Sequence, residues 1–389
     1  MAEASWFKHT VIYHVLIDRF AGFDTLKPVD KPVFLGGNIP AIIKRIPYLK
    51  KLGVETLWIS PFYKTTVYHG YHITDFLEVE PRFGTKKDLK ELIKTIHDNN
   101  MFIIADFVPN HCSRYHPFFQ EAQRKKDSPY VEWFYFKKWP NEYLSFLHFP
   151  EIPKINLDHP PAKEYIIKAA KHWLELGLDG FRLDHVIGPS HKFWSIFKRE
   201  IKKEFPNVIL IGEAWMEGIP FSDLKTIRVK GKYWKWLLGS SSDSLLKSYI
   251  GILDGVLDFK GQQIIRKNIC EKGIVDHSLI VEELNKHYRK FPKDYLLPLF
   301  LDNHDMNRFL FECKNNKDKL KEAARIQFMV EQPVIIYYGT EKGMSQSKSI
   351  WSEKMHGDLY ARQPMIWNGD RELFKFYQEL IQSRKRLYK

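Results

Sequence analysis

The sequence predicts an α/β protein built as a (β/α)₈ TIM barrel, with a short inserted subdomain after its third strand. Three observations lead to this prediction: apolar β-branched runs alternate with helically periodic segments along 389 residues, no GxGxxG turn follows the first strand, and no P-loop occurs. Alternating strands and helices indicate a parallel sheet with right-handed crossovers, and about eight such units close a barrel. A doubly wound open sheet is the alternative, and the missing Gly-rich turn disfavours it.

The first part of the barrel is predicted to occupy residues 1–109. Strands are expected at 11–16, 54–60 and 101–108, and helices at 40–52 and 86–99, where apolar residues recur every three or four positions. Residues 110–158 are rich in Pro, His and aromatic residues and have a weak helical signal. We therefore expect this segment to form the inserted subdomain B.

The second part of the barrel is predicted to occupy residues 159–389, where the alternation resumes. Helices are expected at 162–176, 191–204, 317–329 and 371–386, and strands at 180–183, 208–212, 255–259, 296–301 and 334–338. The last of these helices ends close to residue 389, so no further domain is expected after it.

The composition excludes several classes of protein. A chain that is 44% hydrophobic, 28% charged and 15% aromatic is not disordered, collagen-like or a coiled coil. The net charge of +13 permits contact with nucleic acid or an anionic membrane, but the Lys residues are spread among acidic residues, which is typical of a solvated surface. Three cysteines without a CxxC motif indicate neither a disulfide framework nor a zinc site. No apolar run is long enough to span a bilayer, so we expect a reduced, cytoplasmic protein without nucleic-acid or membrane partners.

Carboxylates follow four of the predicted strands, at the end where a barrel carries its reactive groups. They are Asp106, Asp184, Glu213 and Asp305. Arg182 and Asp184 are two residues apart in one strand, so their side chains point the same way and form a charge-assisted pair. This pair would keep Asp184 ionised and competent as a nucleophile; the alternative is an ion pair that only stabilises the barrel.

Glu213 has a different neighbourhood in the sequence. It stands between Gly212 and Ala214 with no adjacent cation, and this apolar setting would favour its protonated form. A protonated acid suits general acid catalysis, whereas a capping Glu at a helix start is the alternative. One ionised and one protonated carboxyl group together are typical of glycoside hydrolases. His111 and His304 could donate hydrogen bonds to sugar hydroxyls, although a lone His is more often structural.

Taken together in this order, the motifs resemble the α-amylase family of retaining glycoside hydrolases over nearly the whole chain. The motifs that carry the resemblance are residues 53–61, 70–75, 83–85, 106–111, 152–158, 180–184, 212–215, 300–305 and 338–343. Residues 116–134 resemble the insertion of the cyclomaltodextrinase, neopullulanase and maltogenic amylase branch. The N-terminal domain of that branch is expected to be absent here, and the family's C-terminal β-domain absent or truncated.

The resemblance implies a role for each candidate site residue. Asp184 would be the nucleophile, Glu213 the acid/base, and Asp305 the third carboxylate, which holds the hydroxyls of the sugar that is attacked. Arg182 would pair with the nucleophile. Tyr71, His111 and His304 would bind the same sugar, and Asp106 would support the site.

The implied activity is the hydrolysis of α-1,4-glucosidic bonds in maltooligosaccharides, cyclodextrins or starch, through a covalent glucosyl-enzyme. A 4-α-glucanotransferase using the same residues is the alternative. Two more distant alternatives are a non-catalytic amylase-like protein and a nucleic-acid-binding protein. The partner would be an α-glucan, and the motifs leave the oligomeric state open.

No cofactor is required by this chemistry. Many members of the family carry Lys-His at the positions of Ile187 and Gly188, and that His offers its backbone carbonyl to a calcium ion. Only Asn110 and Asp158 remain as plausible ligands. We therefore expect no tight metal site, and at most weak calcium binding.

Overall fold

The computed structural model describes residues 5–217, 219–237, 243–273, 276–353 and 356–388. The chain divides into two units. Among the described residues, the first unit contains 61–81 and 104–256, and the second contains 5–60, 82–103 and 257–388. Each unit has its own set of parallel strands, and the two are described in turn.

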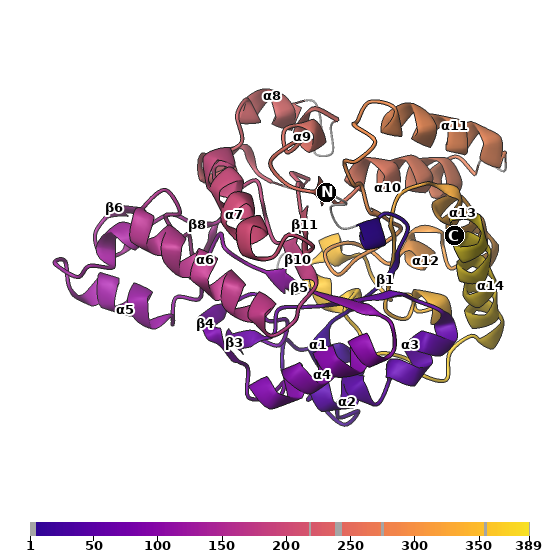
Figure 1. Ribbon diagram of the computed structural model, residues 1–389, viewed down its shortest axis with the longest axis horizontal. Coiled ribbons are helices and arrows are strands. Elements are labelled where there is room, and N and C mark those ends of the chain that lie inside the picture. Colours follow the sequence, from indigo (N-terminus) through magenta and orange to yellow (C-terminus); the bar gives the residue numbers. More distant parts are fainter. Residues whose placement is uncertain (1–4, 218, 238–242, 274–275, 354–355, 389) are drawn as a thin grey trace. The chain divides into compact units, whose positions relative to one another are not determined.

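The first unit is built on four parallel strands, whose order is β12, β11, β10, β5. Their bounds are Phe102–Phe107 for β5, of which 104–107 belong to this unit, Gly180–Leu183 for β10, Ile209–Gly212 for β11 and Gly255–Val256 for β12. The helices that follow two of them, α6 (Pro160–Glu175) and α7 (His191–Glu204), pack side by side (Figure 1). Almost every residue of these strands is buried, as expected for parallel strands that are covered on both faces.

The register of these strands decides which side chains meet. Arg182 of β10 stands opposite Asp106 of β5 on one side and opposite Ile211 of β11 on the other. Because side chains alternate between the two faces of a strand, Asp184 follows Arg182 on the same face, and Glu213 follows Ile211 on the same face. The three carboxylates at these strand ends therefore converge on one arginine.

The segment between β5 and α6 contains short elements only. These are α5 (Pro117–Arg124), a 3₁₀ turn at Val131–Trp133, and the antiparallel pairs β6 (Phe136–Lys138) with β7 (Glu142–Tyr143) and β8 (Ser145–Phe146) with β9 (Phe149–Pro153). A further antiparallel pair, β3 (Tyr63–Thr65) with β4 (Ile73–Val79), precedes β5 in the chain. Aromatic rings fill the interior of the segment, and Phe119 packs against Phe134, Phe136 and Tyr143.

The second unit contains four more parallel strands, in the order β2, β1, β14, β13. Their bounds are Val11–Val15 for β1, Thr56–Ile59 for β2, Leu299–Phe300 for β13 and Val334–Tyr337 for β14. The last helix, α14 (Arg371–Leu387), packs on both α13 (Lys317–Met329) and α3 (Ile46–Leu52). The other α-helices of the unit are α1 (Ile17–Phe20), α2 (Ile39–Ile43), α4 (Lys86–Asp98), α10 (Phe259–Arg266), α11 (His277–Tyr288) and α12 (Phe309–Glu312).

Three predicted elements differ from the structure. The single helix expected at 40–52 is two helices, because Pro47 lacks a backbone N–H and begins α3 instead of continuing α2. The strand expected at 255–259 is only β12, since Asp258 accepts a hydrogen bond from the backbone of Gly261 and caps α10. The strand expected at 296–301 shortens to β13. The other predicted strands and helices are found within two residues of their expected ends.

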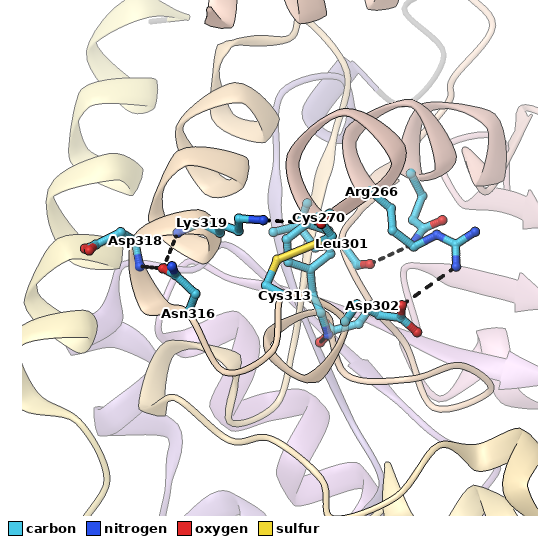
Figure 2. Close-up of a disulfide and its surroundings, with 11 residues drawn as sticks. Arg266, Cys270, Leu301, Asp302, Cys313, Asn316, Asp318 and Lys319 are labelled. Atoms are coloured by element: carbon cyan, nitrogen blue, oxygen red, sulfur yellow. Dashed lines mark hydrogen bonds and ion pairs between the residues drawn. A yellow bond between two sulfur atoms is a disulfide. The ribbon is translucent and has the colours of Figure 1, made fainter. Parts of the chain in front are cut away.

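Cys270 and Cys313 form a disulfide (Figure 2). The expectation that the cysteines are reduced is therefore wrong for this pair. The two residues lie 43 positions apart in the chain, and the fold brings their Cα atoms to 4.8 Å, which no local spacing could reveal. The Lys319 ammonium donates to the carbonyl of Cys270 over 3.3 Å in the same region (Figure 2). The cysteine content thus no longer argues for a reducing compartment. Within the described ranges, no helix has the length and apolar character needed to cross a bilayer.

Candidate active site

Arg182 lies at the centre of the predicted site in the first unit. Its Nη1 donates to Asp106 Oδ1 over 2.9 Å and to Asp184 Oδ1 over 2.8 Å, and its Nη2 contacts Glu213 Oε1. The arginine is 1% exposed. One guanidinium thus holds together the carboxyl groups of three other predicted site residues.

Arg182 contacts three carboxyl groups at once. Burial alone would lower the pKa of Arg182, but Asp106 and Glu213 raise it well above its usual value, so the guanidinium is charged. One positive charge faces three carboxyl groups, and repulsion between like charges favours a proton on one of them. Asp184 and Glu213 are each 7% exposed, whereas Asp106 is 0% exposed. The two carboxyl groups that reach solvent are those assigned to the chemistry, and the enclosed one is assigned to support.

The prediction that Glu213 has no adjacent cation is wrong. The sequence around Glu213 shows only its neighbours along the chain, whereas Arg182 reaches it from the adjacent strand. The backbone N–H of His185 donates to Glu213 Oε2 over 3.0 Å, so donors hold both oxygens. The alternative of a helix-capping Glu also fails, since the next helical turn begins only at Phe221.

Tyr71 is joined to the cluster through Asp106, and His111 lies beside Asn110 and the backbone of Tyr71. The Tyr71 hydroxyl donates to Asp106 Oδ2 over 2.8 Å, which orients the ring predicted to stack on the sugar. Asn110 Nδ2 lies 3.3 Å from His111 Nδ1. Burial, with His72 and Lys154 nearby, lowers the pKa of His111 to about 3, and a hydrogen bond to the backbone of Tyr71 opposes this shift. His111 is therefore neutral at neutral pH, with one nitrogen as donor and one as acceptor.

The inserted segment supplies a residue that sequence reasoning missed. The ring of Phe146, in β8, lies 4.8 Å from that of His111 and 4.6 Å from that of His185. In the same hairpin, His148 Nδ1 lies 3.1 Å from Asp223 Oδ2. The only signal in the sequence was the abundance of aromatic residues at 110–158, which does not single out Phe146.

His304 and Asp305 lie in the second unit and contact each other. His304 Nε2 is 3.0 Å from Asp305 Oδ2. Arg362 donates to Asp305 Oδ1 and to the backbone carbonyl of His304, both over 2.7 Å. Arg362 was not predicted, because it follows no strand and stands 57 positions from Asp305. Arg362 thus forms an ion pair with Asp305, the third carboxylate of the predicted site.

The residues considered as calcium ligands do not fit a calcium ion. Lys154 Nζ donates to Asn110 Oδ1 over 2.7 Å and to the carbonyl of Gly188 over 2.8 Å, so it fills the space between these two oxygens. Asp158 instead accepts from Ser190 over 2.9 Å and from Arg228 over 2.6 Å. Burial, together with the charge of Arg228, lowers the pKa of Lys154 to about 7. In either protonation state the lysine nitrogen stands where a metal would need oxygen ligands.

We therefore expect chelation to leave the stability of the protein unchanged. A ligand that binds only the native state raises the melting temperature by mass action, so a calcium site would reveal itself in this way. Calorimetric scans in excess EDTA and in millimolar calcium should give the same melting temperature. A large decrease in EDTA that calcium restores would contradict the assignment of Lys154.

Replacing Arg182 by Met should strongly destabilise the protein. Three buried carboxyl groups would lose the cation that they share, and breaking a buried ion pair costs about 3–5 kcal/mol. Urea unfolding would measure the difference in free energy. Arg199→Met is the control: Arg199 is exposed and pairs with Glu200, so its loss should cost about 1 kcal/mol or less. Equal stability of the two variants would contradict the central role of Arg182.

Three comparisons describe what this chain is similar to. Residues 14–372 match the model of the α-amylase catalytic domain. The chain is 37% identical to Alpha-amylase 2 of Dictyoglomus thermophilum and 30% identical to a cyclomaltodextrinase of a Bacillus species, each over 98% of this chain. The solved structure of a cyclomaltodextrinase matches this chain with a TM-score of 0.83 at 27% sequence identity. The match covers 99% of this chain and 64% of the cyclomaltodextrinase chain. The chain spans just under two thirds of the length of the two relatives, at 64% and 66%.

Proposed function

The chain belongs to the α-amylase family, and we propose that it is a retaining α-glycosidase that cleaves α-1,4-glucosidic bonds in maltooligosaccharides, cyclodextrins or starch. The catalytic domain of the family is a (β/α)₈ barrel, so the predicted fold class is confirmed. The observation that supports the proposed activity most is the Arg182 cluster. It brings two partly exposed carboxyl groups, those of Asp184 and Glu213, to one guanidinium.

In the first step of the proposed reaction, Asp184 attacks the anomeric carbon of the sugar and forms a covalent ester with it. The bond from that carbon to the glycosidic oxygen breaks as Glu213 donates its proton to the leaving oxygen. Contact with Arg182 keeps the attacking carboxylate ionised and oriented. Repulsion among the carboxyl groups favours one proton in the cluster, and the proposed mechanism places this proton on Glu213.

In the second step, Glu213 removes a proton from water, which attacks the anomeric carbon and releases Asp184. Two inversions at the same carbon restore the α configuration, so the product retains the configuration of the substrate. A sugar hydroxyl in place of water would make the same reaction a transfer. Because Asp184 and Glu213 have the same roles in both outcomes, only product analysis separates hydrolysis from transfer.

The remaining site residues are proposed to bind the sugar, as the family resemblance implies. Tyr71 would stack on the ring, with its hydroxyl anchored on Asp106. His111, which is neutral, would donate to a sugar hydroxyl. Asp305, oriented by Arg362, and His304 would bind further hydroxyls. No nucleic acid or membrane takes part in the proposed function.

Product analysis tests this proposal. The protein is incubated separately with maltotriose, cyclodextrin, pullulan and starch; the products are resolved by size, and the first anomer formed is read by ¹H NMR. We expect shorter α-glucans as products and the α-anomer first, which corresponds to a separation of about 5–5.5 Å between the Asp184 and Glu213 carboxyl groups. Products longer than the substrate would assign a transferase. An initial β-anomer, or no cleavage of any of the four, would overturn the proposal.

A further inference from the structure

We propose that Lys154 is a positioning residue of this site, and that it acts through Asn110 to set which nitrogen of His111 carries the proton. The inference rests on the proposed function only in giving His111 a sugar to bind. Lys154 follows β9 at the end of the inserted segment, and it takes no part in the proposed chemistry. Its contacts, however, reach two loops that carry site residues.

Lys154 orients the side-chain amide of Asn110. Lys154 is 2% exposed, and its Nζ donates to Asn110 over 2.7 Å. In its charged form, the Lys154 ammonium has three donors and no acceptor, so the amide then presents its oxygen to Lys154. Asn110 Nδ2, which only donates, is thereby directed towards His111. The lysine thus removes the ambiguity in the orientation of the amide.

The Asn110 amide in turn determines the tautomer of His111. Asn110 Nδ2 lies 3.3 Å from His111 Nδ1, and since Nδ2 donates, Nδ1 must accept. The neutral ring then carries its proton on Nε2. The hydrogen bond between His111 and the backbone of Tyr71 agrees with this, because Nε2 is the ring nitrogen that does not face Asn110. With substrate bound, this one Nε2–H would be shared between the backbone of Tyr71 and a sugar hydroxyl.

Lys154 also contacts the turn that follows Asp184. Lys154 Nζ also donates to the carbonyl of Gly188 over 2.8 Å, and the N–H of Gly188 donates to the carbonyl of His185 over 3.0 Å. A Cβ atom at position 188 would lie 2.1 Å from Asn110 Oδ1, so only glycine permits this close approach. Lys154 therefore ties the turn after Asp184 to the loop of Asn110 and His111.

Within the described ranges, the charged groups that influence Lys154 have partners other than Asn110. Arg228, Asp158 and Lys232 influence Lys154 electrostatically, and Arg228 donates to Asp158. Lys232 Nζ donates to the carbonyl of Ile227 over 3.0 Å. The amide orientation thus depends on Lys154 rather than on these neighbours.

The experiment compares Lys154→Met with the matched control Lys232→Met, using protein labelled with ¹⁵N-histidine. The His111 signals are assigned from their disappearance in His111→Gln. In the wild type and in Lys232→Met, the ring nitrogens should show a proton on Nε2. In Lys154→Met the amide is free to rotate, so His111 should populate both tautomers, and KM for a maltooligosaccharide should rise roughly tenfold with a smaller change in kcat. Lys154→Arg, which restores donors, should recover part of the loss.

A second variant tests the same chain of contacts without removing the lysine. Asn110→Asp keeps an oxygen for Lys154 but replaces the Nδ2 donor by an acceptor, so the proton of His111 should move to Nδ1. If His111 keeps its proton on Nε2 in both Lys154→Met and Asn110→Asp, the proposal is wrong. The tautomer is measured without substrate, so its outcome does not depend on whether the protein cleaves glucans. Failure to cleave any glucan would overturn the proposed function alone.

Discussion

Replacement of Asp184 by Asn is expected to lower kcat on maltooligosaccharides by roughly 10⁴-fold or more. The amide has the shape of the carboxylate but lacks the negative charge and the nucleophilicity needed to attack the anomeric carbon. Asp184 is 7% exposed, and its Oδ1 accepts from Arg182 over 2.8 Å, a contact that the amide oxygen of Asn can keep. The variant should therefore fold and bind oligosaccharide while it fails to turn over.

The measurements are the steady-state rate on maltotriose, the melting temperature and the dissociation constant for an oligosaccharide. Asp127→Asn is the matched control, since Asp127 is exposed and lies outside the site. It should behave as the wild type in all three. A folded Asp184→Asn variant with wild-type turnover would show that another group is the nucleophile.

Replacement of Glu213 by Gln is expected to lower kcat on maltooligosaccharides by about 10²–10⁴-fold, the usual contribution of a general acid. The effect should depend on the leaving group. A glucosyl fluoride needs no proton to depart, so the formation of the covalent intermediate should be far less impaired with that substrate. Both substrates are measured on the same variant, so the ratio of their losses isolates the proton transfer.

Replacing Glu213 by Gln should also lower the stability of the protein. Both oxygens of Glu213 face donors, Arg182 and the backbone N–H of His185, and the amide nitrogen of Gln would oppose one of them. We expect a loss of stability of about 1–3 kcal/mol, the cost of leaving a buried donor without an acceptor. Equal losses of activity on the fluoride and on the maltooligosaccharide would indicate that Glu213 acts by position alone and not as the acid.

The sequence was sufficient for features that depend on neighbours along the chain. The strand at 180–183 and the helices at 191–204 and 317–329 were predicted with the bounds that the structure shows, because apolar runs and helical periodicity are properties of a local segment. The pairing of Arg182 with Asp184 follows from the two-residue repeat of a strand in the same way. The helix predicted at 40–52 failed because its apolar spacing concealed the break at Pro47.

Only the tertiary structure decided which groups meet across strands and loops. Register placed Arg182 against Glu213, which the sequence had left without a cation. The fold likewise joined Cys270 to Cys313, gave Asp305 its partner Arg362, and put Lys154 between Asn110 and the carbonyl of Gly188. The physical reason is that hydrogen bonds, ion pairs and disulfides act over a few ångströms in space, whereas these partners are 31 to 57 positions apart in the chain. Periodicity determines which face of an element a side chain occupies, and packing determines what that face meets.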